Sequence, residues 1–324
     1  VEWPPVNCTR VELRIAGYYG QSPAIRELEI YGPPAAHPPS ARFQWNQTDT
    51  SLALVRSNTT VWRLTYDPKE GKPYFHPITL ADGSELTGLR PADHPWHRAI
   101  WWSWKLIDGL NYWEEDPKTG KSAGLTELGP VNARPNPDGS ARIEMELGYH
   151  PPEAATVLKE QRVIEVSAPD AAGTIRMDWA STFAAGGADV VLDRTPIPGQ
   201  PDGVGYGGYA GLSARLAAVT RGWIYRGSEG GTGATDLHSK PARWIDFSGP
   251  SGGLAVFDHS KNLRHPTPWY VNQEMPYFSP ALLFNEPFTV TAGRPLTLRY
   301  RLLVHATTLD QAALDNEWTE FIKK

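Results

Sequence analysis

One short stretch of the sequence combines side chains that transfer protons with a side chain that stacks on flat ligands. Asp93, His94 and His97 lie within five residues, and Trp96 stands between the two histidines. In a regular strand His94 and His97 would face opposite sides of a sheet, but Pro95 prevents regular pairing and favours an irregular loop. Both imidazoles can then face one space, where they suit acid–base catalysis, metal ligation or hydrogen bonding to hydroxyl groups.

The residues around this loop extend the same chemistry. Tryptophan rings stack on sugar rings, and paired carboxylates are the usual apparatus of glycoside hydrolysis. We therefore expect a sugar-binding cleft whose candidate catalytic residues include Asp93, His94, His97 and Glu114. The candidate substrate-binding residues in this part of the chain are His76, Trp96, Arg98, Trp101 and Trp113.

A second cluster begins where an apolar run at 254–257 ends. Strand ends and the loops after them are common places for binding residues. We predict that this cluster forms the opposite wall of the cleft, with Asp258 as a further candidate catalytic carboxylate. Its candidate substrate-binding residues are His259, Asn262, His265 and Trp269, to which Tyr206 and Arg215 are added from the chain between the clusters.

Structural roles are the alternative for each of these residues. Loop histidines often hydrogen-bond to backbone, tryptophans often fill the core, and single acids often cap strand ends or face solvent. Glu115, Asp193 and Asp246 also compete with Glu114 and Asp258 as the acid that completes a catalytic pair. Sequence alone does not measure the separation between carboxylates.

Three functions remain open at this point. The leading hypothesis is a carbohydrate-active enzyme, a glycoside hydrolase acting on a plant or algal saccharide without cofactor or metal. The second is a non-catalytic sugar-binding protein. The third is a metal-dependent enzyme, for which imidazole and carboxylate ligands are available. Its candidate ligands are His76, His94, His97, His259 and His265.

Composition limits the partners. The chain has 324 residues and a net charge of −5, with scattered Lys and Arg, which gives no basic footprint for nucleic acid. The densest apolar stretch, 99–104, is far shorter than the roughly 20 residues that a membrane helix needs. Cys8 is the only cysteine, so an internal disulfide is excluded. We expect a saccharide partner and neither nucleic acid nor membrane, and the oligomeric state stays open.

The elements that must position these residues are mainly strands. Short runs with a period of two recur at 52–55, 61–66, 142–147, 162–166, 174–179 and 296–302, with turn signals at 137–139 and 169–173. They predict a large antiparallel β-sandwich over 41–324, of the all-β class. One C-terminal helix is expected after a Thr308 cap, and two glycine-rich segments, 203–208 and 227–233, are expected to be mobile loops beside the cleft.

The N-terminal part differs from the rest. Two alternating runs at 11–15 and 25–31 predict a pair of strands within 1–32, which resembles the end of a discoidin-type galactose-binding domain. A proline-rich linker follows at 33–40. Two strands alone cannot bury a core, so we expect them to pack elsewhere or to continue a module outside this chain.

Six motifs stand out along the chain: PYFHP at 73–77, RPADHPWHRAIWW at 90–102, GLNYW at 109–113, YAGLSAR at 209–215, ARWIDFSG at 242–249 and DHSKNLRHPTPW at 258–269. On these motifs, residues from about 42 to 305 resemble a bacterial family commonly labelled methane oxygenase PmoA-like. The resemblance implies a galactose-mutarotase-like supersandwich, secretion to the periplasm or the exterior, and a link to carbohydrate degradation. Trp96 replaces a common histidine and Ala99 a common glycine, which weakens a metal site at this loop. Because this chain shows no membrane-spanning segment, the oxygenase label is not carried over.

Overall fold

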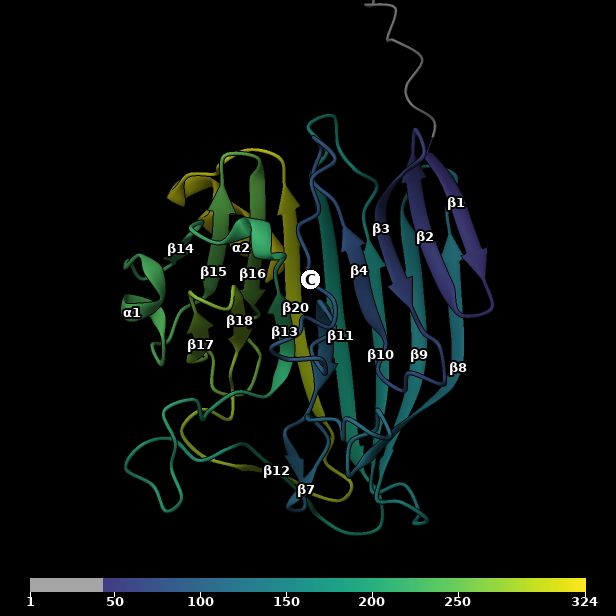
Figure 1. Ribbon diagram of the computed structural model, residues 1–324, viewed down its shortest axis with the longest axis vertical. Coiled ribbons are helices and arrows are strands. Elements are labelled where there is room, and N and C mark those ends of the chain that lie inside the picture. Colours follow the sequence, from purple (N-terminus) through teal and green to yellow (C-terminus); the bar gives the residue numbers. More distant parts are fainter. Residues whose placement is uncertain (1–42) are drawn as a thin grey trace, which may run out of the picture. The chain divides into compact units, whose positions relative to one another are not determined.

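Alternating burial along the strands determines the architecture of the computed structural model, which describes residues 43–324 (Figure 1). In the strand Ala141–His150 (β9), every second side chain from Ala141 to Tyr149 is buried, and the residues between them are partly or fully exposed. A strand that buries one face must pack that face on another layer. The predicted strand pair within 1–32 and the linker at 33–40 lie outside the described residues.

Two eight-stranded sheets and one four-stranded sheet account for the strands. Every paired strand is antiparallel, which confirms the predicted all-β, antiparallel sandwich. The first sheet has the order β1 (Phe43–Thr48), β2 (Ser51–Arg56), β3 (Thr59–Thr65), β4 (Tyr74–Ile78), β5 (Ile100–Ser103), β13 (Gly211–Arg215), β18 (Tyr277–Pro280) and β17 (Trp269–Asn272). The second has the order β14 (Ile224–Gly227), β15 (Trp244–Gly249), β16 (Gly252–Asp258), β20 (Leu296–His305), β11 (Ile175–Ala185), β10 (Leu158–Val166), β9 and β8 (Leu125–Pro135). The small sheet has the order β19 (Phe288–Val290), β12 (Val190–Asp193), β6 (Leu106–Ile107) and β7 (Leu110–Asn111).

The core lies between the two large sheets and is rich in aromatic rings. Phe183 on β11 packs 5.2 Å from the ring of Trp102 on β5 and 5.0 Å from that of Trp104. On β4, Phe75 lies 6.2 Å from Trp179 of β11. Rings at these separations bury a large area and interact favourably with one another. Of the tryptophans predicted to contact a sugar, Trp269 belongs to this core, whereas Trp96, Trp101 and Trp113 lie in a separate cluster.

Strands in the middle of the first sheet are buried on both faces. On β5, Ile100 and Trp102 belong to the core between the sheets, whereas Trp101 points to the opposite, outer face. On β18, Phe278 faces inward and Tyr277 outward. An outer face that is rich in aromatic side chains must be covered, and the loops that cover it create the cavity described below.

The hairpins and the C-terminal helix agree with the sequence, with one correction. The turns at 137–139 and 169–173 join β8 to β9 and β10 to β11 in antiparallel pairs. The helix Gln311–Phe321 (α2) is capped by Asp310, whose carboxylate accepts from the Ala313 amide at 2.8 Å, and not by Thr308. A carboxylate at this position satisfies a free amide of the first turn.

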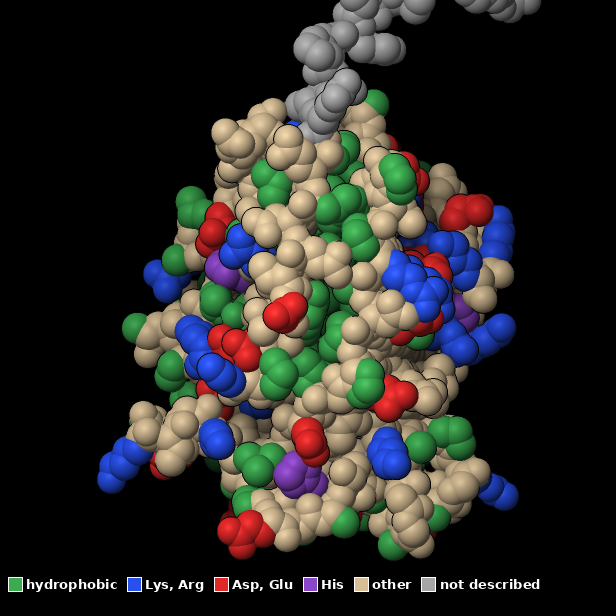
Figure 2. Space-filling model, turned by 90° about the vertical axis from the view of Figure 1, so that its right-hand side faces the viewer, with side chains coloured by type: hydrophobic (Ala, Val, Ile, Leu, Met, Phe, Trp, Pro, Cys, Tyr) green, Lys and Arg blue, Asp and Glu red, His purple; other side chains and the backbone are tan. Residues whose placement is uncertain are grey.

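The fold contains two further short helical segments, a 3₁₀ turn at Ala218–Thr220 and the helix Gly233–Leu237 (α1). Among residues 43–324, no helix is long and apolar enough to cross a membrane. On the face shown in Figure 2, cationic and anionic side chains are interspersed among apolar ones, so this face carries no field of a single sign.

We predict that Phe183→Ala lowers the free energy of unfolding by about 3–5 kcal/mol, because Phe183 fills the space between the two sheets. Urea denaturation followed by tryptophan fluorescence measures the change. Val191, which is 39% exposed, provides the control. Val191→Ala should change stability by less than about 0.5 kcal/mol. Equal effects of the two substitutions would contradict this view of the core.

Candidate functional site

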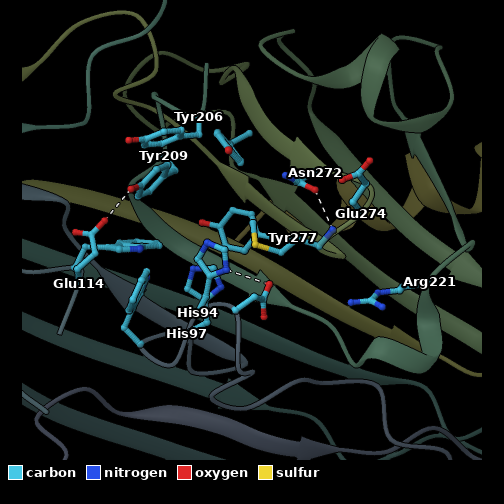
Figure 3. A pocket seen from close by; sticks show the side chains of 14 residues that line it. His94, His97, Glu114, Tyr206, Tyr209, Arg221, Asn272, Glu274 and Tyr277 are labelled. Carbon is cyan, nitrogen blue, oxygen red and sulfur yellow. Dashed lines mark hydrogen bonds and ion pairs between the residues drawn. The ribbon is translucent and has the colours of Figure 1, made fainter. Parts of the chain in front are cut away.

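A cavity of about 920 Å³ opens on the outer face of the first sheet. Several segments far apart in sequence build it: the loop at 93–97, Trp113 and Glu114, the glycine-rich loop that carries Tyr206 and Tyr209, and the β17–β18 hairpin (Figure 3). Its volume lies in the range typical of ligand sites, roughly 300–1,000 Å³. The residues that line it are Asp93, His94, Trp96, His97, Trp113, Glu114, Tyr206, Tyr209, Arg221, Tyr270, Asn272, Glu274, Met275 and Tyr277.

The loop at 93–97 brings its two histidines together as the proline predicted. The His94 amide donates to the Pro91 carbonyl at 3.0 Å, and the His97 amide donates to the His94 carbonyl at 2.9 Å. These consecutive turns place the imidazoles of His94 and His97 face to face, with ring centroids 4.6 Å apart. Ala99, just after the loop, has a φ of 61°, a conformation that glycine adopts without strain.

Asp93 orients His94 and is itself held by Arg215 of the first sheet. His94 Nδ1 lies 3.0 Å from Asp93 Oδ2, and Arg215 Nη2 donates to both oxygens of Asp93 at 2.9 and 2.8 Å. Burial opposes the charge of Asp93, but the hydrogen bonds from Arg215 and His94 outweigh it and lower the pKa of the carboxyl to about 2. An ionised Asp93 requires Nδ1 of His94 to be the donor. Nε2 of His94 then has no hydrogen-bond partner among residues 43–324.

His97 differs from its neighbour because it is 3% exposed. Its ring stacks between His94 and Tyr277, whose centroid is 5.3 Å away. Burial, helped by the nearby His94 and Arg215, lowers the pKa of His97 to about 2. His97 is therefore neutral at ordinary pH and does not donate protons as an imidazolium. Its buried Nδ1 has no hydrogen-bond partner within the described part of the chain.

Glu114 is the carboxylate that the cavity offers on its other side. Its Oε2 is paired with Lys105 and accepts from Asn111 at 2.7 Å, and its Oε1 accepts from the Tyr209 hydroxyl at 3.0 Å. Burial works against ionisation, but the contact with Lys105 and the hydrogen bonds from Asn111 and Tyr209 prevail and lower the pKa of Glu114. Glu114 thus stays ionised, whereas burial raises the pKa of Tyr209 and keeps it a neutral hydroxyl.

The far wall comes from the β17–β18 hairpin, which sequence reasoning missed. Tyr270 and Asn272 alternate with Trp269 and Val271, which point into the core. The sequence shows that these side chains alternate between the two faces of a strand. It does not show which face is covered by loops, so it does not predict that Tyr270 and Asn272 line a cavity. In the hairpin turn, the Met275 amide donates to Asn272 Oδ1 at 2.9 Å. Tyr209, Arg221, Glu274, Met275 and Tyr277 also line the cavity without having been singled out.

The segment from Asp258 to Trp269 does not form this wall, contrary to the prediction. Asp258 is fully buried in the second sheet, where it accepts from His265 Nδ1 at 2.7 Å and from Asn262 at 2.8 Å. His265 stacks on Trp318 of α2, and the ring of His259 lies 5.1 Å from that of Phe321. Trp269 belongs to the main core. These groups fasten α2 and the 259–268 loop to the sheet.

Arg98 and Arg215 are not free to hold a ligand. Arg98 is buried and pairs with Glu115, which also accepts from Arg90 at 3.1 Å. Arg90 donates in addition to the Pro95 carbonyl at 3.1 Å, so this network anchors the loop at 93–97. Lys72 lies 3.5 Å from Glu115, and burial together with Arg98 lowers its pKa to about 7. Glu115 therefore serves this network, and of these two neighbouring glutamates only Glu114 lines the cavity.

The remaining candidates also lie outside the cavity lining. Trp101 lies behind His97, with ring centroids 5.2 Å apart, and supports the cavity floor. His76 Nδ1 lies 3.0 Å from the Thr87 hydroxyl. Asp193 pairs with Arg194, and Asp246 pairs with His305 and Arg226. Of the glycine-rich segments, 203–208 contributes Tyr206, whereas 227–233 contributes no residue to the lining.

Metal ligation was the third hypothesis, and it needs a group of convergent ligands. Within residues 43–324, no three His, Cys, Asp or Glu side chains converge in a way that could hold a metal ion. The five histidines considered as ligands are dispersed: His94 and His97 lie at the cavity, His259 and His265 lie beside α2, and His76 lies beside Thr87.

Comparisons with known proteins give a family without an assigned activity. A family profile described as "Family of unknown function (DUF6807)" matches residues 51–319. No curated protein matches the chain in sequence. Among solved structures, the α-galactosidase from Lactobacillus brevis is similar over 82% of this chain and 39% of its own, with 9% identity and a TM-score of 0.40. The galactosidase domain of an α-galactosidase–sucrose kinase is similar over 82% of this chain and 42% of its own, with 11% identity and a TM-score of 0.38. The chain thus spans about two fifths of the length of each.

We predict that His97 makes the protein sensitive to acid. Below its ordinary pKa of 6.5 the unfolded chain binds a proton at this imidazole, but the folded protein does not until about pH 2. Stability therefore falls by about 1.4 kcal/mol per pH unit as the pH drops below 6.5. His97→Phe removes this titration and keeps a buried ring. From pH 6.5 to pH 4.5 the variant should lose about 2 kcal/mol less stability than the wild type. Urea denaturation at both pH values measures this, and equal losses would show that His97 is protonated in the folded state.

Proposed function

We propose that this chain, which belongs to the DUF6807 family of unknown function, is a carbohydrate-active enzyme that hydrolyses a glycosidic bond in the 920 Å³ cavity. The observation that carries the proposal is the pair formed by Asp93 and His94. It presents an oriented imidazole, 34% exposed, in a cavity whose other walls are tryptophan and tyrosine rings. Aromatic walls suit the apolar faces of sugar rings, and an oriented histidine suits proton transfer near neutral pH.

His94 and Glu114 take different roles in the proposed reaction. Protonated His94 donates from Nε2 to the glycosidic oxygen, the bond between that oxygen and the anomeric carbon breaks, and neutral His94 then accepts a proton from the attacking water. Asp93 stabilises the imidazolium. Glu114 stays ionised and stabilises the positive charge that develops at the anomeric carbon. Two groups with such different protonation behaviour are what acid–base chemistry on a sugar requires.

The charges around the cavity favour a neutral sugar. Arg215 is neutralised by Asp93, and Lys105 by Glu114. Arg221 and Glu274, which have no ion-pair partner among residues 43–324, contribute one charge of each sign. No excess of positive charge is therefore available to an acidic sugar such as a uronate. Hydroxyl groups find donors and acceptors in Asn272, Tyr206 and the free nitrogen of His94.

The resemblance to PmoA-like domains supports two finer parts of the proposal. It implies a link to carbohydrate degradation and a place in the periplasm or outside the cell, and we propose a plant or algal saccharide as the substrate. A non-catalytic sugar-binding protein remains the second candidate, because the aromatic walls alone would serve it. Calorimetry that shows saccharide binding without product formation would favour that candidate.

An activity screen against aryl glycosides and neutral polysaccharides tests the proposal. On a responsive substrate, His94→Ala and Glu114→Gln should each lower kcat by about 10²–10⁴-fold, since one removes the acid and the other the charge stabilisation. His150→Ala is the matched control, because His150 is a partly buried histidine that does not line the cavity. It should leave kcat unchanged. Full activity of His94→Ala would sink the assignment.

A further inference from the structure

A second cavity of about 650 Å³ lies next to the first, and Glu114 lines both. It is built by the chain from Asn111 to Leu125, together with Pro152. Its volume falls in the range of roughly 300–1,000 Å³ that ligand sites occupy. A further cavity, at the turn around Ala81, measures about 190 Å³ and falls below that range.

The two oxygens of Glu114 contact residues from the linings of different cavities. Oε1 accepts from Tyr209, which lines the first cavity. Oε2 accepts from Asn111, which lines the second. The Glu114 side chain is 30% exposed, so a polar group that solvent can reach lines both spaces.

The lining of the second cavity differs chemically from that of the first. It contains no aromatic ring, and its polar groups are the carboxylates of Glu114, Glu115 and Asp116, the hydroxyls of Thr119 and Ser122, the Asn111 amide and the Lys121 ammonium. Lys121 is exposed and has no ion-pair partner in the described part of the chain. Amide, hydroxyl and ammonium groups bind sugar hydroxyls by hydrogen bonds, and they do so without the stacking that the first cavity provides.

We propose that the second cavity is a subsite for further sugar units of the same chain, so that the substrate is an oligosaccharide lying across Glu114. This inference rests on the proposed function of the first cavity. The terminal unit stacks in the aromatic cavity beside His94, and the next units extend over Glu114 toward Asn111 and Lys121. The arrangement places the carboxylate of Glu114 beneath the bond that joins two sugar units, where positive charge develops during hydrolysis.

Isothermal titration calorimetry with a length series tests the inference. The probes are neutral gluco-, galacto-, manno- and xylo-oligosaccharides from the monosaccharide upward. For the sugar that binds, affinity should rise by about tenfold or more from the monosaccharide to longer members, because added units gain contacts in the second cavity. Ala123 is exposed and lines only the second cavity. Ala123→Trp should weaken binding of longer members by about tenfold and leave the monosaccharide within about twofold.

A matched control and the possible outcomes separate the two proposals. Ala312→Trp introduces the same ring at an exposed position on α2, outside both cavities, and should change no affinity. Affinity that does not depend on chain length, or loss of monosaccharide binding in Ala123→Trp equal to that of longer members, would overturn the subsite alone. Failure of every saccharide to bind the wild type would overturn the proposed function as well.

Discussion

The central strands of the first sheet are buried on both faces, and the rest of the structure follows from that constraint. All four residues of β5, from Ile100 to Ser103, are buried. Ile100 and Trp102 of β5 pack between the large sheets, whereas Trp101 of β5 lies on the outer face. Tyr277 of the neighbouring strand β18 lies on the same outer face. Aromatic surface of this extent is unfavourable in water, so loops must cover it. They cover it incompletely, and the gap is the cavity.

Ion pairs hold the covering loops in place and thereby determine the chemistry of the cavity. Arg215 fixes Asp93 from the sheet, and Arg90 fixes the Pro95 carbonyl from the side. Because Asp93 is ionised, His94 presents one defined nitrogen to the cavity. His97, only three residues away, is buried and has lost its proton. Two histidines of one loop thus acquire different roles from their different burial and from the charged groups beside them.

The sequence predicted the fold and one half of the site. Period-two patterning predicted strands such as β9 and β10, and Pro95 predicted a loop that brings two imidazoles together. The opposite wall was predicted at Asp258–Trp269 because that segment is rich in histidine and charge. Those groups instead pair with one another beneath α2. Sequence patterning does not show which face of a doubly buried strand carries loops, and so Tyr270, Asn272 and Tyr277 were missed. Arg98 and Arg215 were predicted to bind a ligand because their ion-pair partners could not be recognised in the sequence. Glu115, the partner of Arg98, is one of three consecutive acids, and Asp93, the partner of Arg215, is far away in the chain.

A crystal structure of the protein soaked with the tightest-binding neutral saccharide tests most directly whether a sugar binds in the aromatic cavity beside His94. We expect a sugar ring in the aromatic cavity, against Trp96, Tyr206 or Trp113, with an oxygen of the sugar within hydrogen-bond distance of His94 Nε2. A saccharide bound elsewhere, with the cavity beside His94 unoccupied, would contradict the assignment of this cavity as the sugar site.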